Sequence, residues 1–106
     1  MTDLSKYCIS FRIADKTVNG KTYEDRWQSI MSAVRGTNGF WDGTTSFVMA
    51  ESTLNTKAFA ETASAGLSAA HDQLIVFDPG DMSMAYFGAV VHPHVLGSFF
   101  RHVSAI

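Results

Sequence analysis

The feature that most constrains the fold is a strictly alternating stretch near the N-terminus. Residues 7–14 read YCISFRIA, in which every second side chain is large and apolar: Tyr7, Ile9, Phe11 and Ile13. Because successive side chains of a β-strand point to opposite faces, the pattern predicts a strand with one apolar face and one mixed face. The rest of the chain must supply elements that cover the apolar face.

A second stretch, residues 73–78 (QLIVFD), is apolar on both faces of the strand that it predicts, because positions 74–77 are Leu, Ile, Val and Phe. A strand of this composition is covered on both sides. The predicted helices can cover one side only. The other side therefore needs either the C-terminal segment or a second copy of the chain.

Two helices are predicted between the strands. Thr22 is a suitable N-cap, and it is followed by an apolar stripe with helical spacing: Tyr23, Trp27, Ile30, Met31 and Val34. Asn55 begins the second helix, which we expect to end at His71-Asp72. Its inward stripe is expected to be Phe59, Ala63, Leu67 and Ala70.

The remaining segments complete the expected fold. Residues 44–51 predict a strand, with Phe40-Trp41 as its bent first part or as a separate paired strand, and residues 82–91 predict an edge strand. After Pro93 the apolar spacing favours a short C-terminal helix, although a strand would also fit. The element order predicts one α+β domain over residues 1–106. We expect a ferredoxin-like sandwich, with two helices on one face of an antiparallel or mixed sheet of four or five strands.

Composition narrows the classes of function. Hydrophobic residues make up 46% and charged residues 17%, which is below the usual value of about a quarter. This balance is typical of a protein with a face buried against another subunit, or of a very apolar core. The net charge of −2 argues against strong nonspecific nucleic-acid binding, although a local patch including Arg12, Lys16 and Lys21 is compatible with it. The lone Cys8, with no signal peptide or long apolar run, predicts a cytoplasmic protein without a membrane segment.

Candidate metal ligands fall into two groups. Asp15, Asp78 and Asp81 follow predicted strand ends, and they would gather at one edge if the first and third strands were parallel neighbours. Paired carboxylates can hold Mg²⁺, but Asp also accepts hydrogen bonds from its own backbone in turns, and we favour the turns. His92 and His94 are weak metal candidates, because zinc needs three or four converging ligands. Apart from Mg²⁺ under a nuclease hypothesis, no cofactor is expected.

Three segments resemble one branch of ferredoxin-like proteins, which contains the small CRISPR-associated adaptation dimer, the VapD endoribonucleases and the SinR-like proteins. The first strand of that group resembles YCISFRI, and its strand leading into a Thr-bearing cap resembles TTSFVMAEST. Its Asp-x-Leu-x-Val strand resembles HDQLIVFDPGD. The resemblance covers roughly residues 5–83 and implies a ferredoxin-like protomer that forms a homodimer.

The group also implies a nuclease, but with one departure. Its nucleases place an acidic residue at the end of the first strand, where this chain has Arg12. A guanidinium cannot ligate Mg²⁺, so Asp15 would have to substitute from the following loop. We therefore favour a non-catalytic homodimer that acts as a binding or scaffold protein. The alternatives are a Mg²⁺-dependent endoribonuclease or toxin, and a small-molecule sensor with a pocket at the dimer seam.

Overall fold

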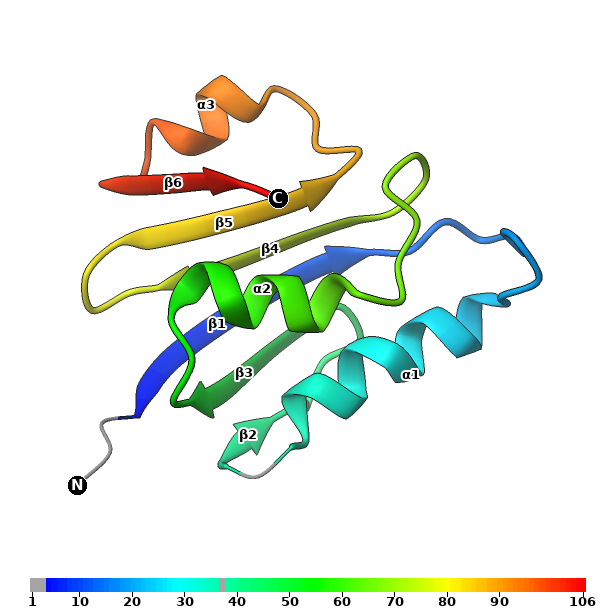
Figure 1. Cartoon of the computed structure of the whole chain (residues 1–106), viewed down its shortest axis with the longest axis horizontal. Coiled ribbons are helices and arrows are strands. Elements are labelled where there is room, and N and C mark those ends of the chain that lie inside the picture. The colour runs from blue at the N-terminus through cyan, green and yellow to red at the C-terminus, as the bar shows by residue number, and fades with distance from the viewer. Residues whose placement is uncertain (1–3, 37) are drawn as a thin grey trace.

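The computed structural model in Figure 1 describes residues 4–36 and 38–106. In this part of the chain the elements are β1 (Ser5–Arg12), α1 (Tyr23–Val34), β2 (Phe40–Trp41), β3 (Phe47–Ser52), α2 (Thr56–Ser64), β4 (Gln73–Asp78), β5 (Ser83–Gly88), α3 (Pro93–Gly97) and β6 (His102–Ala105). The strands form one mixed sheet in the order β2-β3-β1-β4-β5-β6, in which only β5 and β6 pair in parallel. The fold is therefore α+β, with two main helices packed on the sheet.

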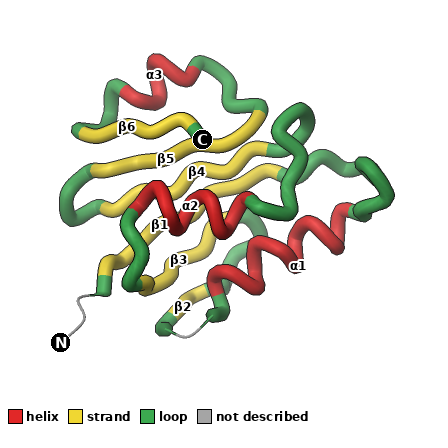
Figure 2. Tube along the Cα trace, viewed as in Figure 1, coloured by secondary structure: helices red, strands yellow, loops and turns green. Residues whose placement is uncertain are grey.

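Both main helices lie on one face of the sheet, which we call the covered face (Figures 1 and 2). The alternation expected in the first strand is confirmed, since Tyr7, Ile9 and Phe11 are all buried on this face. Leu74 and Val76 of β4 join them in the same core. Among the described helices, none is long and apolar enough to cross a membrane.

The sheet is wider than the sequence predicts. Within the described residues it has six strands, whereas four or five were expected. Phe40-Trp41 forms a separate strand, in which Phe40 lies opposite Ala50 and Trp41 lies opposite Met49. The C-terminal helix is a single short turn, and the chain after it extends and pairs with β5. The predicted edge strand β5 therefore lies inside the sheet.

The predicted helix caps are confirmed. Thr22 Oγ1 accepts a hydrogen bond from the Asp25 backbone N–H at 3.0 Å, and Asp25 accepts one from the Thr22 N–H at 2.9 Å. The backbone hydrogen bond from Thr22, followed by the side-chain one, lowers the pKa of Asp25. Asn55 Oδ1 caps α2 in the same way through the Ala58 N–H, at 2.8 Å.

Two expectations for the helices are wrong. Tyr23 is exposed, and Arg26 takes its place in the buried stripe with Ile30 and Val34. The second helix ends at Ser64, well before the expected His71-Asp72. The reason is local, because the Asp72 carboxylate accepts a hydrogen bond from the Ser68 backbone N–H at 2.9 Å. That N–H is therefore engaged in a turn after the helix.

Candidate functional site

The face opposite α1 and α2, which we call the open face, carries a row of apolar side chains running from one edge of the sheet to the other. In the pairing register each member lies directly opposite the next. The members of this open-face row are Trp41, Met49, Cys8, Phe77, Met84 and Val103. Directly opposed side chains in a sheet contact one another. The row is therefore a continuous apolar band.

The C-terminal segment covers one half of this row. The Phe100 ring contacts the Phe77 ring, with centroids 5.3 Å apart. Within this segment, which we call the tail (residues 89–106), Gly97 of α3 lies against Val103 of β6. Met84 is only 1% exposed, although it points away from the two main helices. The C-terminal tail therefore shelters the β4–β5 part of the open face, while Val103 of β6 stays 45% exposed.

The β2–β3 half of the row has no such cover in the described part of the chain. Trp41 is 51% exposed and Met49 is 41% exposed, and the two lie directly opposite each other. We call this half the bare half. Large apolar side chains gathered at a half-exposed sheet surface are typical of a binding surface.

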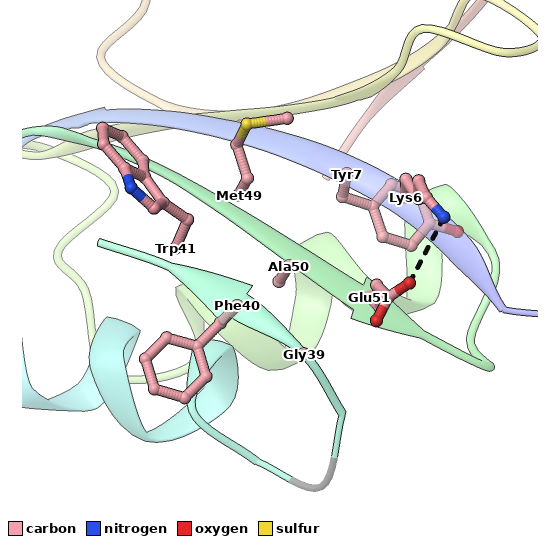
Figure 3. A pocket seen from close by; sticks show the side chains of 8 residues that line it. All are labelled: Lys6, Tyr7, Gly39, Phe40, Trp41, Met49, Ala50 and Glu51. Carbon is pink, nitrogen blue, oxygen red and sulfur yellow. Dashed lines mark hydrogen bonds and ion pairs between the residues drawn. The ribbon is translucent and has the colours of Figure 1, made fainter. Parts of the chain in front are cut away.

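A groove of about 270 Å³ lies in the bare half, beside Trp41 and Met49 (Figure 3). Its opposite end is closed by the ion pair between Lys6 Nζ and Glu51 Oε2, at 3.3 Å. Gly39 lies across from Glu51, and a Cβ at that position would come within 2.6 Å of Glu51 Oε1. A side chain at position 39 would therefore crowd the Glu51 carboxylate at the border of the groove.

Trp41 is held in place although half of it is exposed. A Cβ at Gly43 would lie 2.5 Å from the indole ring, so the ring rests directly over the Gly43 backbone. An exposed aromatic ring whose position is already fixed loses little conformational entropy on binding. Trp and Met are also enriched in protein–protein interfaces. The bare half therefore has the composition and the preorganisation of an interaction surface.

Cys8 stands in the middle of the open-face row and is buried. Burial, and secondarily the negative charge of Asp78, raises the pKa of its thiol. A thiol with a raised pKa is a poor nucleophile. Cys8 therefore contributes apolar contact to the row.

The carboxylates of Asp78 and Asp81 are engaged in the turn between β4 and β5. Asp78 Oδ1 accepts a hydrogen bond from the Gly80 N–H at 2.7 Å. Asp81 Oδ1 accepts from the Ser83 hydroxyl at 2.6 Å and from the Ser83 N–H at 2.9 Å. These bonds, with the hydroxyl contributing most, lower the pKa of Asp81. Both carboxylates therefore have the turn geometry that their sequence context favours.

Asp15 lies away from this turn. The condition for gathering Asp15 with Asp78 is not met, because β1 and β4 are antiparallel, with Arg12 opposite Gln73. Asp15 follows the end of β1 that adjoins the start of β4, while Asp78 closes the far end of β4. Among residues 4–36 and 38–106, no three His, Cys, Asp or Glu side chains are grouped so as to hold a metal ion.

The other candidate residues lie on exposed segments. Arg12 ends β1 on the open face, and Lys16 and Lys21 lie in the exposed loop that follows it. His92 is the N-cap residue of α3, with a φ of 52°, and His94 lies within that helix. The structure places the two histidines on an exposed turn and the three cations at the end of β1.

A buried ion pair between α1 and the start of β4 was missed from sequence. Arg26 Nε donates to Asp72 Oδ2 at 2.9 Å, and both side chains are at most 1% exposed. The guanidinium also donates to the carbonyls of Lys21 and Ala14, both at 2.7 Å. Asp72 Oδ1 accepts from the Ala14 N–H at 2.9 Å. The pair therefore joins three chain segments at one end of the sheet.

A periodicity signal could have revealed this arginine. Arg26 precedes Ile30 and Val34 by four and eight residues, which is the spacing of a single helix face. Charged residues are rarely buried unless they are paired, so a stripe predicted from apolar residues does not include Arg26. The partner, Asp72, is distant in sequence, so the pairing has no local signature.

Comparison of the chain with protein-family models, with curated proteins and with solved structures finds no match. The protein can therefore be classified by its structure alone. It is an α+β protein whose sheet has one covered face and one partly bare apolar face.

Proposed function

We propose that this protein is a non-catalytic binding or scaffold module that forms a homodimer through the open face of its sheet. The observation that carries the proposal is the bare half of the open-face row, where Trp41 and Met49 stand side by side and half exposed. Removing apolar surface from water contributes about 25 cal/mol per Å². Covering this face with a second copy of the chain would remove both side chains from water.

The edges of the sheet offer less to a partner than its face. The β2 edge is only two residues long, and such short edge strands discourage pairing with another chain. At the other edge, α3 lies beside β6, with Gly97 against Val103. These features favour association through the face.

The size of the face supports a weak dimer. The open-face row spans five inter-strand spacings of about 4.8 Å, so it is about 24 Å long. With strands about 20 Å long, each copy offers roughly 500 Å², compared with about 800 Å² per partner in a standard interface. The net charge of −2 leaves only modest repulsion between copies. We therefore expect a reversible dimer with a Kd in the micromolar range.

We also propose that the protomer is ferredoxin-like, as the sequence resemblance implies. Support comes from the first four strands, whose order in the sheet is β2-β3-β1-β4 with antiparallel neighbours. Two crossover helices, α1 and α2, connect these strands on one face of the sheet. The β5–β6 extension is additional to that arrangement, and it carries the C-terminal tail that shelters Phe77 on the open face.

Size-exclusion chromatography with light scattering, over a concentration series from 1 to 200 μM (roughly spanning the expected Kd), tests the proposal. We expect the mass to rise from monomer to dimer. Met49→Asp should keep the protein monomeric at every concentration, because it places a charge in the bare half. Tyr23→Asp is the matched control, since Tyr23 is equally exposed but lies on α1. A wild-type chain that stays monomeric throughout would overturn the proposal.

The groove gives a second candidate, a sensor that binds a small apolar molecule. The volume of the groove is slightly below the range of about 300–1,000 Å³ that is usual for pockets that bind drug-sized ligands. Quenching of Trp41 fluorescence by an apolar probe such as anilinonaphthalene sulfonate, in a Trp27→Phe background, tests this candidate. Binding that Met49→Asp abolishes would support it. The nuclease alternative has no comparable support, because Asp15 lies away from the turn that engages Asp78 and Asp81.

A further inference from the structure

We propose that the dimer is reciprocal, with Phe99 of each copy occupying the groove of the other. This inference rests on the proposed dimerisation through the open face and names the segment that fills the groove. Phe99 is 70% exposed and directly precedes Phe100, which is anchored on Phe77. The groove is lined by Trp41 and Met49, so an aromatic side chain suits it.

The shape of the open face carries the argument. Its β4–β5 part is raised by the tail, because Phe100 lies against Phe77, and Met84 opposite Phe77 is buried. Its β2–β3 half is bare and contains the groove. One face therefore presents a projection at one end and a depression at the other. A surface of this kind can be complementary to itself.

Two arrangements of a face-to-face dimer can be compared. A two-fold axis that runs across the strands places each tail over the partner's tail, and each groove over the partner's groove. The projections then collide and the grooves stay empty. A two-fold axis along the strand direction, between β1 and β4, reverses the open-face row from one copy to the other. It places the tail of each copy over the bare half of its partner.

The second arrangement buries apolar surface on both sides. Phe99 enters the groove, and Val95 of α3, which is 61% exposed, lies nearby in the same tail. A buried aromatic side chain removes about 150–250 Å² from water. Both contacts occur twice in the dimer because the interface is symmetric. Each tail thus covers the bare half of the partner's sheet, which is the half that it does not cover on the sheet of its own chain.

Engineered cysteines can distinguish the two arrangements. Glu51 borders the groove on β3. Ser98 is exposed and adjoins Phe99. The two positions lie toward opposite edges of the sheet, and β3 and β6 are separated by four spacings, or about 19 Å. A disulfide needs Cα atoms within about 7 Å, so a 51–98 bond can form only between two chains.

The experiment uses a Cys8→Ala background that carries either Glu51→Cys or Ser98→Cys. This design keeps Trp41, Met49 and Phe99 intact. After mild oxidation, we expect the equal mixture of the two variants to give a covalent dimer linked through positions 51 and 98. Each variant alone should give little. Non-reducing electrophoresis and peptide mass spectrometry identify the linkage.

The alternative results separate this inference from the proposed function. A disulfide in the Glu51→Cys variant alone would show that the axis runs across the strands, and it would overturn the inference. A dimer by light scattering with no 51–98 linkage would also overturn it, while the proposed dimer would stand. A monomer at all concentrations would overturn both.

A second measurement tests the same contact by shortening the Phe99 side chain, without engineered cysteines. We expect Phe99→Ala to raise the Kd of the dimer about tenfold, which is typical of losing a central aromatic anchor. Val91→Ala is the matched control, because Val91 is similarly exposed but lies before α3. Equal Kd values for the wild type and Phe99→Ala would contradict the inference. Circular dichroism spectra of both variants check that the fold is retained.

Discussion

The two faces of this sheet are built from the same strands with the same alternation, yet they are stabilised in different ways. On the covered face, Tyr7, Ile9 and Val76 lie beneath two helices and are almost fully inaccessible. On the open face, the neighbouring side chains form an apolar row that the chain's own tail covers only at β4 and β5. The difference shows that alternation identifies a buried face reliably, while the cover of the second face depends on segments far away in the sequence.

The largest expected effect comes from the ion pair that secures the covered face. Arg26→Met removes one partner and leaves the Asp72 carboxylate buried without a counter-charge. We expect a loss of about 4 kcal/mol in the free energy of unfolding. Urea denaturation followed by circular dichroism measures it, at a protein concentration low enough to keep the chain monomeric, because dimerisation would add apparent stability.

The exposed pair between Arg35 and Asp42 is the control for this prediction. Its atoms approach to 2.6 Å, closer than those of the buried pair, but both side chains are partly exposed. We expect Arg35→Met to cost less than about 1 kcal/mol. Equal losses for Arg26→Met and Arg35→Met would mean that burial of the Arg26 pair has been misjudged.

A second prediction compares one position on each face. Leu74→Ala opens a cavity beneath the helices and should cost about 3 kcal/mol of monomer stability. Met49→Ala lies in the bare half and should cost less than about 0.5 kcal/mol. The same Met49→Ala change should weaken the dimer, and Leu74 makes no direct contact with a partner. A large loss of monomer stability in Met49→Ala would show that the bare half is packed within one chain.

The smallest expected effect lies in the turn between β4 and β5, at one end of the sheet. Ser83→Ala removes the hydroxyl that donates to Asp81, so the pKa of this carboxyl should rise toward its ordinary value of 3.8. Carbon-13 NMR titration of the carboxyl group measures the shift. Thr56→Val is the control, because it removes the Thr56 contact to Ser83 and keeps the Asp81 bond. An unchanged pKa in Ser83→Ala would contradict the assignment.

The sign of the related pH effect follows from the direction of this shift. The pKa of Asp81 is lower in the folded chain than its ordinary value of 3.8. The stability contributed by the hydrogen-bonded carboxylate is therefore present above that value, and it is lost as the pH falls through the lower folded-state pKa. Ser83→Ala should reduce this acid-dependent loss, which thermal unfolding between pH 5 and 2, roughly the span of carboxyl titration, can detect.

The locally encoded parts of the fold could be predicted from sequence. The alternation around Ile9 and the caps at Thr22 and Asn55 all depend on residues within a few positions of one another. The Asn19-Gly20 turn belongs to the same class. Both residues have positive φ, and Val18 and Lys21 exchange backbone hydrogen bonds around them at 2.9 Å.

The parts that sequence missed depend on distant partners. The burial of Arg26 depends on Asp72, which lies 46 residues away in the sequence. The extended C-terminal strand depends on β5, since its spacing alone is compatible with a helix. The antiparallel arrangement that separates Asp15 from Asp78 is a property of topology, which no local motif specifies.

The candidate site was visible in part. A strand that is apolar on both faces predicts that something must cover the second face, and Phe77 is indeed sheltered by Phe100 of the tail. The uncovered remainder lies at Trp41 and Met49, which belong to strands that sequence did not separate. Register across the sheet brings these residues into one row with Phe77, and register is not readable from a single segment.

The accessibility of Trp41 tests the central claim most directly. In a Trp27→Phe variant, Trp41 is the single tryptophan of the chain, and acrylamide quenching of its fluorescence reports its exposure to solvent. If the bare half is buried against a second copy, quenching should be strong in dilute protein and should fall severalfold as the concentration rises through the dimer Kd. Equally strong quenching at every concentration would show that this face stays in contact with water, and it would contradict the account.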